Sequence, residues 1–315
     1  MLFAGFDTSV YTTSLAVVDQ HERLVAEARK KVDVKKGERG VRQSEAVFQH
    51  LRQLPLLWKE VASRVQAGEL QAVAASLKPR PREGSYMPVF RVGESFAAFL
   101  SSTLGIPLLG CSHQECHLLA GFWDRGLSPG NYLVLHVSGG TTELLQVNLR
   151  ESGVEEVTVQ GGSRDLAAGQ FVDRVGVALG LAFPAGPELE KLSREVAAAE
   201  GEPLLAISVD DTWISFSGPA SQAQRLLEQG EVSPQALARG VELCLARSLV
   251  ACVQNAVRRN EAAGGVLLVG GVASNRRIAS FIREQVDLPV EVVEPKYAVD
   301  NAVGSALYAC KKFRN

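Results

Sequence analysis

The chain has 315 residues, of which 46% are hydrophobic and 22% are charged, and its formal net charge is -2. This length predicts about two globular domains, whose cores are large enough to fold without disulfides or structural metals. The near balance of 33 basic and 35 acidic residues excludes a strongly cationic protein that holds nucleic acid by bulk charge, but it allows a local basic patch.

Features of membrane and secreted proteins are missing from the sequence. No apolar run reaches the ~18 residues that cross a bilayer, so we expect no membrane contact. The start, Met1 to Asp7, lacks the basic residues and cleavage site of a signal peptide. The five cysteines (111, 116, 244, 252 and 310) are odd in number and scattered, so they predict neither a disulfide framework nor a zinc pattern. We expect a cytoplasmic protein.

A unit of strand, polar turn and strand occurs twice. Apolar segments 2–6 and 14–18 flank the first turn, and segments 132–137 and 144–147 flank the second. The repeat predicts a duplicated α/β architecture with an N-terminal lobe over 1–131 and a C-terminal lobe over 132–315. The two turns read Asp7-Thr8-Ser9 and Ser138-Gly139-Gly140-Thr141-Thr142.

The remaining elements follow from periodicity and punctuation. A helix over 44–64 is expected to bend or split at Pro55. Ser112, with Glu115 three residues later, predicts a capping box. The other predicted helices cover 91–104, 112–122, 163–181, 187–199, 234–260, a segment ending at 285, and a closing helix capped by Asp300. The other predicted strands cover 71–76, 106–109, 266–269 and 290–293.

The two polar turns suit phosphate binding. Their small residues let backbone N–H groups approach phosphate oxygens, and their hydroxyls add donors. The Asp7 carboxylate can hold Mg²⁺ directly or through water. Either turn alone is better explained as an ordinary hairpin turn. Their duplication favours two phosphate hairpins that share one cleft for an ATP- or AMP-type nucleotide with Mg²⁺.

A glycine-rich turn follows the predicted strand 266–269. Gly270 and Gly271 permit a tight turn against a flat ring or ribose, and the helix that follows favours nearby negative charge. The GxGxxG fingerprint is absent, and a plain strand–helix connection explains the turn equally well. Asp165 and Asp173 lie on roughly one face of the predicted helix 163–181, where solvated acids are the simpler interpretation.

His113 and His117 stand four residues apart, so they share one helical face and can chelate one metal. Glu115 points off that face and is badly placed as the general base of an HExxH protease. Asp300 is the best distant candidate for a third ligand. Histidines that only pack or lie on the surface remain the alternative.

Basic residues gather in two segments, and such segments could contact RNA phosphates. A solvated loop is the simpler interpretation of each. The first segment contains Arg29, Lys30, Lys31, Lys35, Lys36, Arg39 and Arg42, and the second contains Lys78, Arg80 and Arg82.

Together these elements resemble the TsaD family, the threonylcarbamoyl transferases of tRNA that were long mislabelled O-sialoglycoprotein endopeptidase or glycoprotease. The resemblance covers nearly the whole chain in order. The matching runs are Asp7-Thr8-Ser9, Arg39-Gly40-Val41 with Glu45, His113-Gln114-Glu115-Cys116-His117, Val137-Ser138-Gly139-Gly140, Ala168-Gly169-Gln170-Phe171-Val172-Asp173, Pro184-Ala185-Gly186-Pro187, Ser215-Phe216-Ser217-Gly218, Gly270-Gly271-Val272-Ala273-Ser274-Asn275 and Asp300-Asn301-Ala302.

The resemblance implies a two-lobed actin-like ATPase (ASKHA) fold with a nucleotide cleft. It implies transfer of threonylcarbamoyl from threonylcarbamoyl-AMP to N6 of the tRNA adenosine beside the anticodon. It also implies tRNA, a carbamoyl-adenylate synthase and helper subunits as partners. By the same resemblance, iron or zinc is held by His113, His117 and Asp300. The implied donor-binding residues are Val137, Ser138, Gly139, Gly140 and Thr141 at the phosphates or carbamoyl-adenylate, and Asp173, Gly186 and Asn275 at ribose and adenine.

The chain also departs from the family pattern. A Gly-Pro-Gly run is missing after Ser76. Three single residues and one run of three also differ: Cys116 replaces glycine, Thr141 replaces histidine or asparagine, Gln170 replaces glutamate, and Pro219-Ala220-Ser221 replaces Leu-Lys-Thr. These departures indicate a divergent member or paralogue. They motivate an alternative hypothesis, a non-catalytic nucleotide-binding paralogue or scaffold subunit of the modification complex. A metalloprotease or another kinase or carbamoyl transferase on the same fold fits the residues less well.

Overall fold

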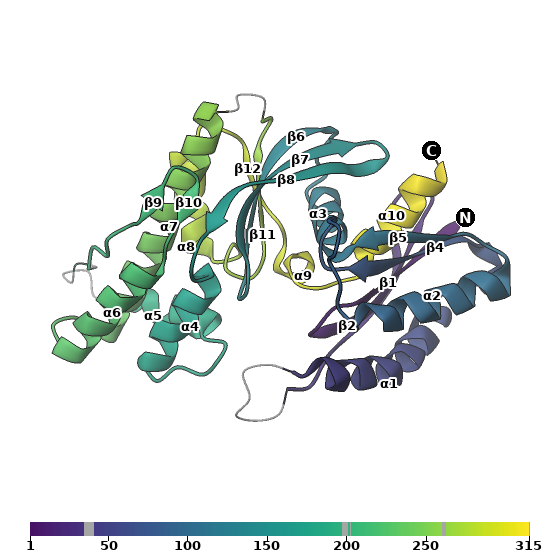
Figure 1. The fold of residues 1–315 in the computed structure, drawn as a ribbon, viewed down its shortest axis with the longest axis horizontal. Coiled ribbons are helices and arrows are strands. Elements are labelled where there is room, and N and C mark those ends of the chain that lie inside the picture. The colour runs from purple at the N-terminus through teal and green to yellow at the C-terminus, as the bar shows by residue number, and fades with distance from the viewer. Residues whose placement is uncertain (35–40, 197–200, 202, 260–262, 315) are drawn as a thin grey trace. The chain divides into compact units, whose positions relative to one another are not determined.

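The computed structural model describes residues 1–34, 41–196, 201, 203–259 and 263–314 (Figure 1). The chain folds into two compact units. Unit 1 comprises Met1–Leu127, Arg150–Glu155 and Val299–Asn315, and unit 2 comprises Ser128–Leu149 and Glu156–Ala298. The predicted lobes met at 131/132 and placed the closing helix in the C-terminal lobe. In the structure that helix packs in unit 1, because its small residues fit closely against the first strand.

Unit 1 is built on a five-stranded sheet of order β3-β2-β1-β4-β5. Strands β1, β2 and β3 are antiparallel neighbours, whereas β4 and β5 add in parallel to β1. Its strands are β1 (Leu2–Thr8), β2 (Thr12–Asp19), β3 (Leu24–Lys31), β4 (Leu70–Lys78) and β5 (Leu108–Ser112). Its helices are α1 (Gln43–Ala62), the short 3-10 turn η1 (Ala67–Glu69), α2 (Phe90–Leu104), α3 (His113–Asp124) and α10 (Val303–Arg314).

Unit 2 is built on a seven-stranded sheet of order β12-β11-β6-β7-β8-β10-β9. Its strands are β6 (Gly130–Val137), β7 (Thr142–Arg150), β8 (Gly153–Ser163), β9 (Val209–Asp210), β10 (Trp213–Ile214), β11 (Val266–Val269) and β12 (Val290–Val292). Its helices are α4 (Ala168–Ala178), α5 (Gly186–Ser193), α6 (Ser217–Gln229), α7 (Pro234–Arg259), α8 (Arg276–Gln285) and α9 (Pro295–Ala298).

The two sheets share one topology. In each sheet the first three strands lie side by side in chain order, and two later strands are added next to the first one. The resulting orders are β3-β2-β1-β4-β5 in unit 1 and β8-β7-β6-β11-β12 in unit 2. Each unit therefore opens with a strand–turn–strand hairpin, β1–β2 or β6–β7. The duplication that the sequence predicted is confirmed.

Helices cover both faces of the unit 1 sheet. The side chains of β1 alternate, so that Phe6 joins the core that Leu54 of α1 and Val92 of α2 complete. Gly5 points the other way, where a Cβ would overlap the backbone of Ala306 in α10. Figure 1 shows α1 and α2 side by side against the sheet, with α10 drawn in yellow. The close approach of α10 depends on Gly5.

Some elements were placed wrongly from the sequence. Strand β8 extends to Ser163, so the predicted helix 163–181 begins only at Ala168. Strand β8 was missed because its glutamates, Thr158, Gln160 and glycines break up the apolar pattern. Helix α1 continues through Pro55 without splitting. Within the described ranges, no helix is long and apolar enough to cross a membrane.

Candidate functional site

The carboxyl ends of β1, β4 and β5 meet at one edge of the unit 1 sheet, because these strands are parallel neighbours. Asp7 is the last residue but one of β1, and Ser76 lies near the end of β4. Helix α3 starts directly after β5 with His113. Ligand sites of open α/β sheets form at this edge.

The start of α3 is fixed by the predicted capping box. The hydroxyl of Ser112 accepts a hydrogen bond from the Glu115 backbone N–H at 3.2 Å, and the Glu115 carboxylate accepts one from the Ser112 N–H at 2.8 Å. Glu115 is therefore committed to the helix end. This agrees with the expectation that it does not act as the base of a metalloprotease.

The two histidines of α3 face one carboxylate. Oδ1 of Asp300 lies 3.1 Å from Nε2 of His117 and 3.4 Å from Nε2 of His113. The imidazole centroids are 4.5 Å apart and their planes are nearly perpendicular. One ligand atom from each residue lies within 4.8 Å of the other two. Only the outer part of the site reaches solvent, since the His117 side chain is 7% exposed and that of Asp300 is 25% exposed.

Asp300 reaches the histidines from the segment before α10. The sequence predicted that Asp300 caps this helix, but Oδ1 of Asn301 accepts the Val303 N–H instead, at 3.0 Å. The Asp300 carboxylate is thereby left for the histidines. Its second oxygen accepts a hydrogen bond from the Ser9 hydroxyl at 2.6 Å. The Ser9 hydroxyl, which the sequence predicted to bind phosphate, thus holds the carboxylate of Asp300 in place.

Asp7 lies behind His113. Its Oδ1 accepts a hydrogen bond from Nδ1 of His113 at 2.8 Å and another from the Ser76 hydroxyl. Asp7 is completely buried, and its Oδ2 has no hydrogen-bond partner among the described residues. Thr8 lies in the core, where its hydroxyl donates to the Val89 carbonyl and accepts from the Gly93 N–H. Asp7 and Thr8 belong to β1, and the turn comes only after them.

Charge coupling shifts the pKa values of the triad. Burial tends to lower the pKa of His113, but the carboxylates of Asp7 and Asp300 outweigh it and raise that pKa well above its ordinary value. Burial tends to raise the pKa of Asp300, but hydrogen bonds from His113 and His117 outweigh it and hold that pKa well below its ordinary range. The carboxylate is therefore ionised at neutral pH.

The donor set of this triad fits a metal ion. Two imidazole nitrogens and one carboxylate oxygen are the ligands that zinc takes in catalytic sites and that iron(II) takes in facial triads. The bond to Asp7 keeps a proton on Nδ1 of His113, so Nε2 is the ring nitrogen that would bind an ion once it gives up its own proton. The unpartnered, buried Oδ2 of Asp7 adds a further oxygen beside the site.

The second polar turn lies in unit 2, between β6 and β7. The Ser138 N–H donates to the Thr141 carbonyl at 2.8 Å, and the Thr141 N–H donates to the Ser138 hydroxyl at 3.2 Å. Gly139 and Gly140 face open space. The start of α4 rests on this turn, because a Cβ on Gly169 would overlap Gly139 and because the Gly169 N–H donates to the Ser138 carbonyl.

The glycine-rich turn after β11 also lies against the β6–β7 turn. Gly270 has a φ of +106°, and a Cβ there would overlap the Val137 carbonyl. The N–H groups of Val272 and Ala273 both donate to that carbonyl. Gly271 has nothing within 4 Å of a Cβ position. The structure thus brings Val137 and the residues of both turns together within unit 2.

The residues predicted to hold ribose and adenine have partners in the protein. Oδ1 of Asp173 accepts the Ala185 N–H at 2.8 Å, just before Gly186 begins α5, and burial raises the pKa of Asp173. Asn275 caps α8, because its Oδ1 accepts the N–H groups of Arg277 and Ile278. Its Nδ2 donates to the buried carboxylate of Glu242 at 2.6 Å. Both ends of the Asn275 amide are thus engaged in structure.

Asp165 does not share a helix face with Asp173, so the expected pair of carboxylates is wrong. Asp165 precedes α4 and caps α6 instead, where its oxygens accept the N–H groups of Phe216 and Ser217. Burial raises the pKa of Asp165, but the hydrogen bonds from the Ser217 hydroxyl and from these N–H groups outweigh burial and lower it to about 2. Its acidity is explained by a helix N-terminus.

The described part of the first basic segment is divided between two elements. Arg29, Lys30 and Lys31 end β3, where Arg29 forms an ion pair with Glu27 at 2.6 Å. Arg42 stands before α1. The other members of this segment, and two residues of a matching run, lie outside the described residues, namely Lys35, Lys36, Arg39 and Gly40.

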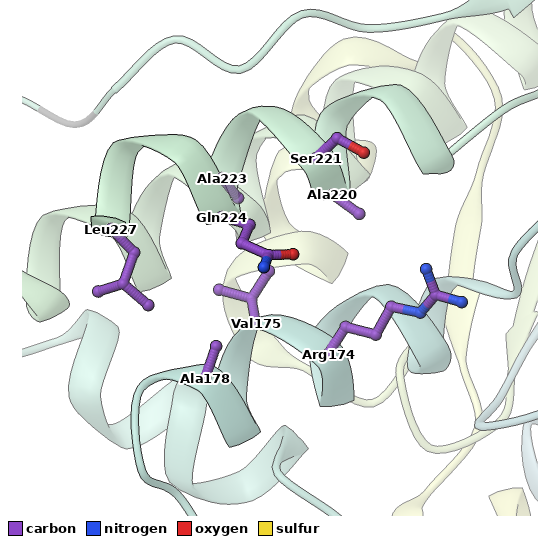
Figure 2. A pocket seen from close by; sticks show the side chains of 8 residues that line it. All are labelled: Arg174, Val175, Ala178, Ala220, Ser221, Ala223, Gln224 and Leu227. Carbon is purple, nitrogen blue, oxygen red and sulfur yellow. The ribbon is translucent and has the colours of Figure 1, made fainter. Parts of the chain in front are cut away.

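A small hollow of about 50 Å³ lies between α4 and α6 in unit 2 (Figure 2). In Figure 2, Val175 and Arg174 come from α4, and Gln224 and Leu227 come from the facing helix α6. One water needs about 10–15 Å³, so the hollow holds a few waters and is too small for a nucleotide. None of the predicted site residues lines it.

Comparison with known proteins decides the family. The sequence model described as TsaD: tRNA N6-adenosine threonylcarbamoyltransferase matches residues 23–307. The chain belongs to the TsaD family. Proteins named tRNA N6-adenosine threonylcarbamoyltransferase are similar to this TsaD member. One from a strain of Thermus thermophilus is 32% identical and aligns over 98% of this chain and 91% of its own length. Another, from Geobacillus thermodenitrificans, is 32% identical and aligns over 96% of this chain and 91% of its own length.

Solved structures show the fold of this TsaD member. HypF from T. kodakarensis matches with a TM-score of 0.63 at 15% identity and covers 99% of this chain and 48% of its own. Component A of (R)-2-hydroxyglutaryl-CoA dehydratase from Acidaminococcus fermentans matches with a TM-score of 0.60 at 14% identity, over the full length of both chains. The predicted actin-like ASKHA fold and membership of this transferase family are both confirmed.

Two residues that contact the predicted site residues were missed from the sequence. Ser76 donates to Asp7, and Glu242 accepts from Asn275. Ser76 ends an apolar strand next to β1, so a correct sheet order would have found it. Glu242 is one acid inside the long helix α7, and nothing in its local pattern marks it as buried.

Proposed function

We propose that this chain transfers threonylcarbamoyl from threonylcarbamoyl-AMP to N6 of the tRNA adenosine beside the anticodon. The observation that carries the proposal is the triad of His113, His117 and Asp300, whose ligand atoms lie within 4.8 Å of one another in a chain of this family. In the reaction the adenosine nitrogen attacks the carbamoyl carbonyl, the bond to AMP breaks, and the nitrogen loses a proton.

The triad would hold one zinc or iron ion. When bound, the ion supplies a Lewis acid for the donor's carbonyl group. Asp7 keeps the His113 ring oriented, and Ser9 holds the second oxygen of Asp300. These contacts fix two ligand side chains before an ion arrives, which lowers the entropic cost of binding it.

The two turns of unit 2 would bind the adenylate part of the donor. Gly139, Gly140 and Gly271 leave open space beside the backbone, as a closely approaching phosphate or ribose requires. Asp173 and Asn275 would act mainly by shaping this surface, because their side chains are bonded to the protein. Mg²⁺ would accompany an ATP-type ligand. A tRNA substrate fits the predicted cytoplasmic location, and synthase and helper subunits would supply the donor.

The first test measures transfer with stoichiometric protein, labelled threonylcarbamoyl-AMP and unmodified tRNA. We expect modified tRNA with the wild type and at least a 100-fold slower reaction with His117→Ala or Asp300→Ala. His21→Ala is the matched control, because His21 is an exposed histidine on a turn of unit 1. The proposal fails if the wild type leaves tRNA unmodified while the Thermus thermophilus relative modifies it under the same conditions.

A non-catalytic scaffold is the second candidate. A specific observation favours it, since Ala220 of α6 stands where the family pattern has lysine, so this position carries no charge for binding phosphate. Metal content separates the candidates. A parent protein with one equivalent of iron or zinc, lost in His113→Ala, supports the transferase. A metal-free parent that still binds ATP supports the scaffold.

A further inference from the structure

Two cysteines next to His113 and His117 in the sequence are in contact with each other. Cys111 lies in β5 and Cys116 in α3, and their side chains are 4% and 1% exposed. Their Sγ atoms are 2.7 Å apart. A disulfide bond is about 2.0 Å long, so the sulfurs need to approach by less than about 1 Å to form one.

The surrounding residues hold both sulfurs in this arrangement. The Ser305 hydroxyl donates to Sγ of Cys116 at 3.2 Å, and the Cys111 thiol donates to the Ala75 carbonyl at 3.4 Å. Gly304 lies so close to Cys116 that a Cβ there would overlap the Cys116 carbonyl. Neighbours on α10 and β4 therefore fix the two thiols against each other.

The other cysteines are not arranged in this way. The thiols of Cys244, Cys252 and Cys310 each donate to a backbone carbonyl, of Ala206, Thr212 and Asp19 respectively. Among the described residues, Cys111 and Cys116 are the only cysteines whose thiols contact each other, and both are free thiols. His113 lies between the two cysteines in the sequence, and Cys116 directly precedes His117.

We propose that Cys111 and Cys116 form a reversible intramolecular disulfide, which makes the start of α3 a redox modification site. The oxidant is hydrogen peroxide. One sulfur attacks a peroxide oxygen, the O–O bond breaks, and water and a sulfenic acid form. The second sulfur then displaces the sulfenic oxygen as water and the S–S bond closes. In sum, two thiols and hydrogen peroxide give one disulfide and two waters, and a dithiol reductant reverses the change.

Burial sets the expected reactivity of this pair. The thiols are at most 4% exposed, so a small, uncharged oxidant is expected to reach them and a bulky aromatic disulfide reagent is expected to be excluded. We therefore expect hydrogen peroxide to oxidise the folded protein at this pair and the bulky reagent to leave it reduced until the protein unfolds.

Tryptic peptides provide the test. Peptide 92–125 contains both Cys111 and Cys116, because no lysine or arginine lies between Arg91 and Arg125. The full-length reduced protein is treated with hydrogen peroxide, denatured, alkylated and digested. We expect peptide 92–125 to be lighter by two hydrogen atoms and to carry no alkyl group, and to gain two alkyl groups after treatment with dithiothreitol. The peptides with Cys244, Cys252 or Cys310 report background oxidation.

Single substitutions control for the pairing. Cys111→Ala and Cys116→Ala each remove one partner, so their peptides must carry one alkyl group or oxygen atoms and never lose two hydrogens. Cys310→Ala is the matched control, since it removes a buried cysteine of unit 1 and must leave the disulfide intact. Circular dichroism checks that each variant folds. The proposal is overturned if the wild-type peptide 92–125 still carries two alkyl groups, or only added oxygen, after the peroxide treatment.

Discussion

Oδ1 of Asp7 lies 2.8 Å from Nδ1 of His113, on the opposite side of the ring from Asp300. The bond joins the end of β1 to the first residue of α3. It fixes the ring orientation and the tautomer in which Nε2 is free to bind a metal. The ligand geometry therefore depends on a residue that is itself completely buried.

Asp7→Asn is expected to weaken zinc binding by about 10–100-fold, because the substitution removes the charge that holds the proton of His113 on Nδ1. A competitive titration of the metal-free protein against a zinc chelator measures the change. Asp33→Asn, at an exposed position in unit 1, serves as the control and should bind zinc as the wild type does. Equal affinities for Asp7→Asn and wild type would show that Asp7 does not position the ligand.

Gly304→Ala is expected to destabilise unit 1 by about 1–3 kcal/mol, because the new Cβ would overlap the backbone of Cys116. Gly218→Ala is the matched control. Each glycine is the second residue of its helix, but Gly218 has nothing within 4 Å of a Cβ position. Urea unfolding compares the two variants. Similar free energies of unfolding would contradict the close approach of α10.

Asp165→Ala is expected to destabilise unit 2 by about 1 kcal/mol at pH 7, the usual value of a helix N-cap. The charge of Asp165 adds little to this value, because the side chain is exposed and solvent screens it. The pKa of Asp165 in the folded state is lowered to about 2 from an ordinary 3.8. Its stabilisation is therefore fully present above pH 3.8 and is lost as the pH falls through about 2.

Urea unfolding at several pH values checks this dependence. The difference in free energy of unfolding between wild type and Asp165→Ala should shrink between pH 4 and pH 2. A difference that stays constant over this range would show that the carboxylate charge does not cap α6.

Asn275→Ala is expected to destabilise unit 2 by about 1–3 kcal/mol, since it removes the cap of α8 and leaves the Glu242 carboxylate buried without that donor. Asn275→Asp keeps the cap but places a second carboxylate against Glu242, so its loss of stability should be larger at pH 7 than at pH 5. Thermal unfolding at both pH values measures this. An Asp variant as stable as wild type at pH 7 would refute the bond to Glu242.

Local patterns predicted one part of the candidate metal site. The four-residue spacing of His113 and His117 and the Ser112 capping box depend only on one helix, so the sequence alone indicated both. Asp300 could be named only as the best distant acid. Its contact with the histidines depends on α10, whose place follows from the small residues that it packs against β1.

Register and long-range capping explain what could not be predicted. The bond between Ser76 and Asp7 requires that β4 lie beside β1 in parallel, which no short window of sequence reveals. Asp165 looked like part of a helix, yet the N–H groups that it accepts belong to residues about fifty positions later. Both cases depend on neighbours that only the tertiary fold supplies.

The separation of the ligands along the chain has a consequence for synthesis. Asp300 lies 183 residues after His117, and it is held in place by a helix that follows it. A nascent chain on the ribosome thus carries both histidines long before the carboxylate emerges. The candidate metal site can close only after α10 has left the exit tunnel and docked on β1.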